Sequence, residues 1–263
     1  GVNYLFEASV GGGIPIIRPM SQCLIANNIE GVAGILNGTT NFILTKMIED
    51  GMTFEAALKL AQDNGYAEKD PTADIEGFDA CRKVCILASL AFGKHVYPNQ
   101  VEAEGITNIT LEDVSYISSI GGVIKLLGQI KYINDDKIAA FVSPAVVFHG
   151  SQLASVNGVF NAILVRGDAV GDVCFYGQGA GKLATASAVV ADMVDSAVHV
   201  ERRINFGWSA GNEDYVVDEK ATIEMPFYVR AKSSEPKVKA LLNDVKFLTR
   251  VGQPSDEVAF ITD

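Results

Sequence analysis

The side chains with the most reactive chemistry gather between Gly65 and Lys83. Asp79 and Lys83 are four residues apart in a segment with helical spacing, so they share one face, with the acid on the N-terminal side that an ion pair prefers. A partly buried lysine held by an aspartate is a good proton donor or oxyanion stabiliser. Spacing alone also fits a solvated surface pair that contributes about 0.5 kcal/mol. The apolar residues around the pair favour the buried alternative.

Three further carboxylates precede this pair, on Glu68, Asp70 and Asp74. Pro71 fixes one backbone angle and biases Asp70 towards an extended conformation, which limits the movement of this acidic loop. Several carboxylates in one restrained loop suit a ligand that carries an ammonium group. The stretch therefore predicts recognition of a cation next to a proton donor.

Helical and strand patterns place these groups within a larger domain. The acidic loop should follow a helix that Thr53 caps at its start and that Gly65 ends in the left-handed conformation. Thr110 and Asp113 predict a capping box for a later helix. The expected helices are residues 15–27, 41–49, 54–62, 78–91, 110–119, 183–200 and 236–242. The expected strands are residues 4–8, 29–36, 123–133, 138–148, 159–165, 170–176, 223–231 and 257–261.

The order of these elements defines the expected fold class and domains. Strands and helices mix without strict alternation, which is typical of an α+β fold, here a mixed β-sheet layered with helices. The four strands between residues 121 and 176 should form one sheet. We expect a domain over residues 1–212 and a small partial β-α-β unit over residues 213–263.

Composition excludes several classes of function. The formal net charge of −11 over 263 residues argues against a nucleic-acid surface, because phosphate binding needs clustered Lys and Arg. No run reaches the roughly 18 apolar residues of a membrane helix, and the first residues do not resemble a signal peptide. Four cysteines in a chain of this length predict a reducing, cytoplasmic location. Cys81 and Cys85 could be half of a metal site, but no second Cys or His pair accompanies them.

Five stretches spread over residues 1 to 200 resemble the homoserine dehydrogenase family. They are ASVGGGIP at 8–15, ILNGTTNFIL at 35–44, the whole of 65–83, LASVNGVFNA at 153–162, and GQGAG at 177–181 followed by TASAVVAD at 185–192. The family reduces aspartate semialdehyde to homoserine with NADPH or NADH, on the route to threonine, methionine and isoleucine. The resemblance therefore implies an oxidoreductase of amino-acid biosynthesis.

The resemblance also implies a role for individual residues of the acidic stretch. Lys83 matches the family's catalytic lysine, which protonates the alkoxide as hydride reaches the aldehyde carbon. Glu68 and Asp79 match contacts to the substrate, and Asp74 and Tyr66 match the same pocket. Carboxylates suit this place because the substrate carries an ammonium group.

Two sets of residues near the glycines match binding positions for the cofactor and an ion. Gly65, Gly179 and Gly181 match positions close to the dinucleotide, where a side chain would obstruct the approach of the backbone. A sodium site is implied by one acid and three backbone carbonyls, which belong to Glu7, Val10, Gly12 and Ile14. One carboxylate with several carbonyls suits a hard, weakly charged cation. The alternative is a glycine turn with an acid that caps a helix.

The chain departs from the family's pattern at both ends. The family begins with a Rossmann domain that carries a glycine-rich fingerprint, and no such fingerprint opens this sequence. We therefore expect a fragment that binds dinucleotide poorly and does not turn over alone. Residues 213–263 resemble the start of an ACT domain, although the usual Asp-x-Pro-Gly is replaced by Ser234-Glu235-Pro236-Lys237.

The resemblance implies a homo-oligomer that pairs through the strands of residues 123–176. In this interpretation, residues 1–212 form the substrate-binding, catalytic and dimerisation domain. The alternative hypothesis is that the chain is a non-catalytic amino-acid-binding or assembly module of the same ancestry. Lys83 favours catalysis, because a binding module needs no lysine beside acids that bind an ammonium group.

Overall fold

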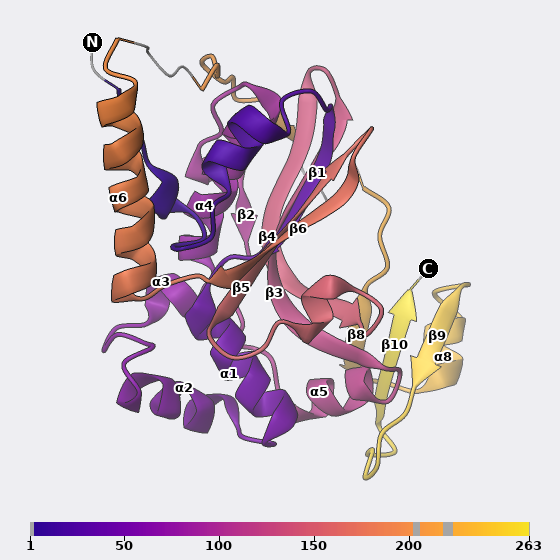
Figure 1. Cartoon of the computed structure of the whole chain (residues 1–263). Helices are drawn as coiled ribbons and strands as arrows, with labels where there is room; N and C mark the ends of the chain where they lie inside the picture. Colours follow the sequence, from indigo (N-terminus) through magenta and orange to yellow (C-terminus); the bar gives the residue numbers. More distant parts are fainter. Residues whose placement is uncertain (1–2, 202–205, 218–222, 263) are drawn as a thin grey trace.

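The computed structural model describes residues 3–201, 206–217 and 223–262 of the chain. Its centre is a mixed sheet in the order β2-β4-β3-β1-β5-β6, with β7 paired to β4 (Figure 1). The strands are β1 (Ile29–Ile35), β2 (Glu102–Ala103), β3 (Gly122–Asn134), β4 (Lys137–Phe148), β5 (Phe160–Gly167), β6 (Gly171–Gln178) and β7 (Val216–Val217). The prediction that the strands of residues 121–176 share one sheet is confirmed. The sequence did not predict that β1 lies at its centre, between β3 and β5.

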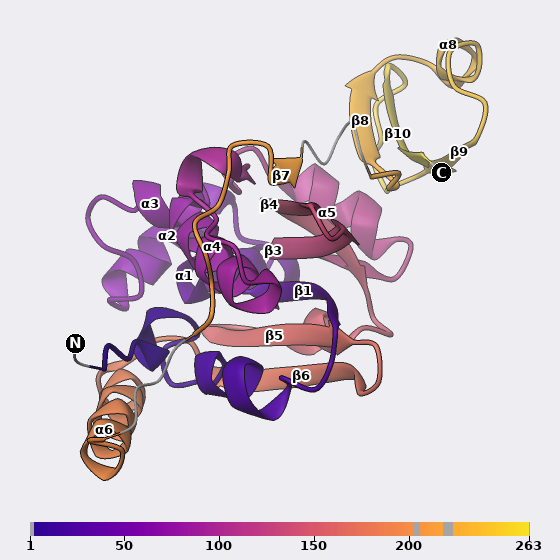
Figure 2. The ribbon, with the colours of Figure 1, turned by 90° about the horizontal axis from the view of Figure 1, so that it is seen from above.

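Helices cover one face of this sheet and enclose the main core. They are α1 (Gly38–Glu49), α2 (Phe54–Asp63), α3 (Thr72–Ile75), α4 (Phe78–Phe92) and α5 (Leu111–Ser118). Figure 2 shows α1 to α4 on the same side of the strands. The approach of α4 is close because β3 has a glycine there: a Cβ on Gly128 would lie 2.5 Å from Cγ2 of Val84. The predicted α+β layering is therefore correct.

Local signals set the helix boundaries. The Thr53 hydroxyl accepts the N–H of Ala56 and caps α2, and Thr110 and Asp113 form the predicted capping box of α5. Gly65, after α2, has the left-handed φ of +72° that its role as a terminator requires. Asn37 caps α1, which begins at Gly38 rather than at the predicted Asn41.

The strand predicted for residues 4–8 is wrong, and the helix predicted for residues 15–27 is too long. The chain forms the 3-10 turn η1 (Glu7–Ser9) and then the short π-helix η2 (Pro19–Cys23). The buried Glu7 carboxylate accepts the backbone N–H groups of Ile16, Ile17 and Arg18 at 2.7–2.9 Å. These bonds fold residues 7–18 into a compact loop, because Glu7 satisfies the first backbone N–H groups of the helical segment, which have no partner within it.

The other face of the sheet carries a smaller apolar cluster, which the short η4 (Gln152–Ser155) helps to form. Leu153, Ala154 and Val156 from this segment pack against Ile35 and Leu127. Beside the cluster, the half-buried Phe160 ring stacks on the exposed Tyr176 ring, with centroids 5.4 Å apart. This face is therefore apolar and partly exposed.

The helix α6 (Lys182–Val198) lies at the side of the molecule, next to the first described residues (Figure 1). Only Ala188 of its residues is buried. Its exposed apolar side chains include Leu183, Met193, Val194 and Val198. No described helix has both the length and the apolarity needed to cross a bilayer.

A second, three-stranded sheet follows in the order β8-β10-β9 (Figure 2). Its elements are β8 (Tyr228–Lys232), α8 (Glu235–Lys239), β9 (Val245–Leu248) and β10 (Glu257–Thr262). Because β10 lies antiparallel between β8 and β9, the unit is a split β-α-β followed by a strand. The strand β9 was not predicted, because it has only four residues. Residues 218–222, near the start of the small unit predicted over residues 213–263, lie outside the described residues.

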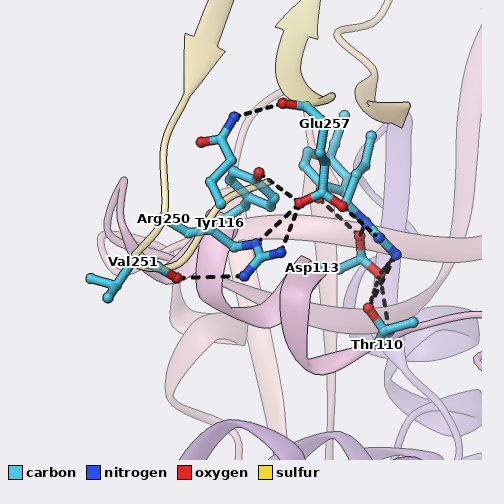
Figure 3. A network of polar contacts seen from close by, with 9 residues as sticks. Thr110, Asp113, Tyr116, Arg250, Val251 and Glu257 are labelled. Carbon is cyan, nitrogen blue, oxygen red and sulfur yellow. Dashed lines mark hydrogen bonds and ion pairs between the residues drawn. The ribbon is translucent and has the colours of Figure 1, made fainter. Parts of the chain in front are cut away.

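Charged side chains fasten this small sheet to α5 (Figure 3). Arg230 of β8 donates to both carboxylate oxygens of Asp113 on α5, from Nε at 2.7 Å and from Nη2 at 3.3 Å. Glu257 of β10 accepts the Tyr116 hydroxyl at 2.9 Å and Nη2 of Arg250 at 2.8 Å. We call these five residues the α5 clamp.

A buried lysine ties η4 to α1 and β3. Lys125 is 1% exposed, and its ammonium donates to the carbonyl of Val156 at 2.6 Å and to the side-chain oxygens of Asn157 and Asn41. All three acceptors are neutral. Burial lowers the pKa of Lys125 to about 8, and the more distant Glu49 opposes this shift only in part.

This lowered pKa predicts how stability depends on pH. Between about pH 8 and 10.5 the folded Lys125 has lost its proton while the unfolded lysine keeps it. Stability therefore rises with pH in this window, by roughly 3 kcal/mol for a shift of this size. We expect urea denaturation to show this rise as a difference between the wild type and Lys125→Met. The exposed Lys137→Met is the control and should follow the wild type. Parallel curves for wild type and Lys125→Met would contradict the assignment.

Candidate functional site

The side chain of Asn37 joins two of the predicted site carboxylates at the start of α1. Its Oδ1 accepts the N–H of Thr40 and caps the helix, which orients the amide. Its Nδ2 then donates to Oδ1 of Asp74 at 2.7 Å and to Oδ2 of Asp79 at 2.9 Å. One capping residue therefore draws α3 and the first turn of α4 against α1.

Lys83 completes this cluster from the second turn of α4. Its Nζ donates to Oδ2 of Asp79 at 2.6 Å and to the carbonyl of Leu36 at 2.8 Å. The side chain is 19% exposed, so the pair is half-buried, as its apolar neighbours predicted, and is not a solvated surface pair. An ammonium has three protons, and within the described residues two are hydrogen-bonded. The third is left for a ligand.

The two carboxylates also keep acceptors for a ligand. Within the described chain, Oδ1 of Asp79 and Oδ2 of Asp74 have no hydrogen-bond donor. The cluster thus offers two carboxylate oxygens and one ammonium proton in a small space. This arrangement can bind a cationic group and give a proton to a neighbouring oxygen.

The remaining predicted substrate residues lie on the loop between α2 and α3. The carbonyl of Tyr66 accepts the Thr39 hydroxyl at 2.7 Å, and its exposed ring meets Phe42 edge-on at 5.0 Å. These contacts hold the loop against the first turns of α1. Glu68 is exposed. Among the described residues, its carboxylate has no contact with the cluster of Asn37, Asp74, Asp79 and Lys83. The structure therefore brings Asp74, Asp79 and Lys83 together but leaves Glu68 apart.

The three predicted cofactor glycines differ in their surroundings. A Cβ on Gly65 would meet nothing within 4 Å, and one on Gly181 would meet only the end of Gln178 at 3.9 Å. Both have positive φ and face open space, so they leave room for a ligand beside the backbone. A Cβ on Gly179 would instead lie 2.1 Å from Cγ of Asn161. Packing inside the chain already requires a glycine at this position.

The predicted sodium residues form the loop before η2. The Glu7 carboxylate is engaged by three backbone N–H groups, as the capping alternative expects. Among the described residues, the carbonyls of Val10, Gly12 and Ile14 accept no hydrogen bond. No cluster of three acidic, histidine or cysteine side chains occurs in that part of the chain either. The loop therefore has carbonyl oxygens without hydrogen-bond donors, while its one carboxylate is already bound by the backbone.

Two participants were missed by the sequence analysis of the site. Asn37 and the carbonyl of Leu36 orient Asp79 and Lys83, yet Asn37 entered only as part of a motif. Its position three residues before Thr40, at an Asn-Gly turn, is the signal of a helix cap. That signal predicts the capping bond, but it does not predict that the other end of the amide reaches two acids.

A mixed sheet covered by helices, with a half-buried Lys–Asp pair beside a second carboxylate, has the groups of a small-molecule site of the acid–base type. Residues 15–194 match the family model described as homoserine dehydrogenase. A homoserine dehydrogenase from Synechocystis is 48% identical over 198 residues, which are 74% of this chain and 46% of that protein. The chain belongs to the homoserine dehydrogenase family.

Solved structures agree with this assignment. A homoserine dehydrogenase from Thiobacillus denitrificans superposes with a TM-score of 0.82 at 38% identity, over 98% of this chain and 62% of its own. A hyperthermophilic archaeal homoserine dehydrogenase in complex with NADPH superposes with a TM-score of 0.62 at 30% identity, over 75% of this chain and 56% of its own. The chain spans about half the length of the curated relatives it matches.

Proposed function

We propose that this chain supplies the substrate-binding and proton-donating side of a homoserine dehydrogenase, which reduces aspartate semialdehyde to homoserine with NADPH or NADH. One observation carries the proposal. Asp79 and the Leu36 carbonyl bind two protons of the Lys83 ammonium, which leaves the third for a ligand, next to two carboxylate oxygens that have no donor. The choice of aspartate semialdehyde as the substrate follows from the family to which the chain belongs. The pathway role in threonine, methionine and isoleucine synthesis and a cytoplasmic location belong to the same proposal.

Each charged group of the site has a role in this reaction. Asp74 and Asp79 bind the ammonium group of the substrate and so orient its aldehyde towards Lys83. Tyr66 and Glu68 would contact the substrate from the neighbouring loop, although Glu68 lies apart from the two carboxylates in this structure. Lys83 gives a proton to the aldehyde oxygen as that oxygen gains negative charge, which leaves a hydroxyl on the product and a neutral amine on the lysine.

The cofactor and the ion are also parts of this proposal. A bound nicotinamide dinucleotide supplies the hydride that reaches the aldehyde carbon. Gly65, Gly179 and Gly181 would lie along it, and the NADPH complex of the archaeal relative supports this class of cofactor. The carbonyls of Val10, Gly12 and Ile14, with Glu7, would hold a sodium ion near the glycine turn. A melting temperature that is equal in sodium and tetramethylammonium buffers would argue against this ion.

A homo-oligomer that pairs through the second face of the large sheet is the assembly we propose. The stacked Phe160 and Tyr176 rings and the η4 cluster make this face apolar. Exposed apolar patches of this kind commonly mark protein interfaces. A monomer at all concentrations in sedimentation equilibrium would contradict this assembly.

Binding of L-homoserine to the chain itself tests the substrate side. We expect Asp79→Asn and Asp74→Asn each to weaken binding about tenfold or more, because each removes a charge-assisted hydrogen bond. Isothermal titration calorimetry measures the dissociation constants. Asp63→Asn, an equal charge change on the exposed side of α2, should leave binding unchanged. Equal affinity in all four proteins would place the substrate elsewhere.

A non-catalytic amino-acid-binding module is the second candidate. The carboxylates of Asp74 and Asp79 alone would satisfy it. It predicts the same binding results but no proton transfer from Lys83, so turnover separates the two candidates.

A further inference from the structure

A buried amide on β5 lacks the partners that such groups need. Asn161 is 1% exposed, and neither its Nδ2 nor its Oδ1 has a hydrogen-bond partner among the described residues. Nearly all buried side-chain amides in folded proteins are paired, because an unpaired one has lost its bonds to water without replacement. An unpaired amide inside a folded core therefore needs an explanation.

The amide lies where the glycine stretches of the sequence meet. A Cβ on Gly179 would lie 2.1 Å from both Cγ and Nδ2 of Asn161, and a Cβ on Gly38 would lie 3.7 Å from its Oδ1. Gly12 in turn touches Gly179, since a Cβ there would lie 2.2 Å from the Gly179 carbonyl oxygen. On one side, then, is the start of α1 with Asn37, and on the other is the glycine loop that leads into α6. The backbone of Gly179, which belongs to that loop, lies directly against the amide.

The chemistry of the amide selects the class of ligand. An amide presents one donor and one acceptor side by side, and both are unused here. The carboxylate of an amino-acid substrate only accepts, and its ammonium group only donates. A carboxamide has both a hydrogen-bond donor and an acceptor, and it pairs with another amide through two hydrogen bonds. The nicotinamide ring of the proposed cofactor carries such a group.

We propose that Asn161 binds the carboxamide of the nicotinamide ring, with Nδ2 donating to its carbonyl and Oδ1 accepting from its NH₂. This inference rests on the proposed function and adds a residue that orients the ring. Gly179 moves aside when the ring binds, which is easy for a residue without a side chain in a loop of three glycines. The ring then lies beside the start of α1, where Asn37 binds Asp79 and the Leu36 carbonyl binds Lys83.

Asn161→Leu tests the proposal, because leucine has a similar shape and no polar atoms. The variant is made in the full-length Synechocystis relative, in which the matching residues of this chain replace the segment that they match. We expect the KM for the dinucleotide to rise about tenfold or more and the KM for homoserine to change less than about twofold. The melting temperature should not fall, since no hydrogen bond inside the chain is lost. Asn99→Leu, an exposed change, should leave all three values unchanged.

A cofactor analogue shows whether the contact is direct. The 3-acetylpyridine dinucleotide keeps the carbonyl but lacks the NH₂ that Oδ1 of Asn161 would bind. The wild type should bind the natural dinucleotide more tightly than this analogue, and Asn161→Leu should bind both equally. An unchanged KM in the variant, or the same discrimination in variant and wild type, would overturn the proposal. Absence of turnover in the wild-type chimaera would instead contradict the proposed function.

Discussion

Replacing Lys83 with methionine should lower the turnover number of the dehydrogenase by ~10²-fold or more, the loss typical of a missing proton donor. Methionine keeps the length and apolar contacts of the lysine stem but has no proton to give. The two carboxylates remain in place, because Asn37 holds them independently of the lysine. The dissociation constant of L-homoserine should therefore change by less than about threefold.

Steady-state kinetics in the chimaera and calorimetry on the chain measure these two effects separately. Lys46→Met is the matched control, because Lys46 also pairs with an aspartate four residues away but lies on the exposed side of α1. Its turnover should stay within about twofold of the wild type. Unchanged turnover in Lys83→Met would favour the non-catalytic amino-acid-binding module.

Removing Asp113 from the α5 clamp should lower the free energy of unfolding by about 3 kcal/mol. Asp113→Ala leaves Arg230 and Tyr228 without their shared acceptor and removes the capping box of α5. Urea denaturation measures the loss. Hydrogen exchange in β8 and in its neighbour β10 should locate it, because Asp113 holds β8 to α5 and β10 pairs with β8 (Figure 3).

The clamp should also fail in acid. Burial alone would raise the pKa of Asp113, but hydrogen bonds from Arg230, from the Thr110 N–H and from Tyr228 outweigh it and lower this pKa below 3.8. The stabilisation is therefore complete above the unfolded pKa and is lost as the pH falls through the lower folded value. The stability difference between wild type and Asp113→Ala should therefore shrink as the pH falls below the ordinary aspartate pKa of 3.8. Glu235→Ala, which breaks an exposed pair with Lys239, should cost less than about 0.5 kcal/mol at any pH.

Elements with strong periodicity or clear caps were predictable from the sequence. The strands β3 to β6 and the helices α2, α4 and α5 follow from alternation, from Thr53 and from the Thr110–Asp113 box. The loop around Glu7 was not, because its shape depends on bonds from Glu7 to residues nine to eleven positions away. β9 was missed because four residues give too little pattern to separate a strand from a loop.

The candidate site was predictable in its residue types but not in its connections. Spacing placed Asp79 and Lys83 on one face of a helix, and the structure has them paired at 2.6 Å. Asn37 and Asp74 are 37 residues apart, so no local pattern shows their contact. The unpaired amide of Asn161 is also invisible in the sequence, because the lack of a partner is a property of the packed core.

The apolar side of α6 has a practical consequence for any preparation of this chain. A net charge of −11 suggests good colloidal behaviour, since like-charged molecules repel each other. The helix α6 nevertheless has an exposed apolar patch, made by Leu183, Met193, Val194 and Val198. Salt screens the charge repulsion but does not weaken hydrophobic contacts between such patches. Light scattering should therefore increase with ionic strength. Storage buffers for this chain should be chosen for this one helix rather than for the average composition.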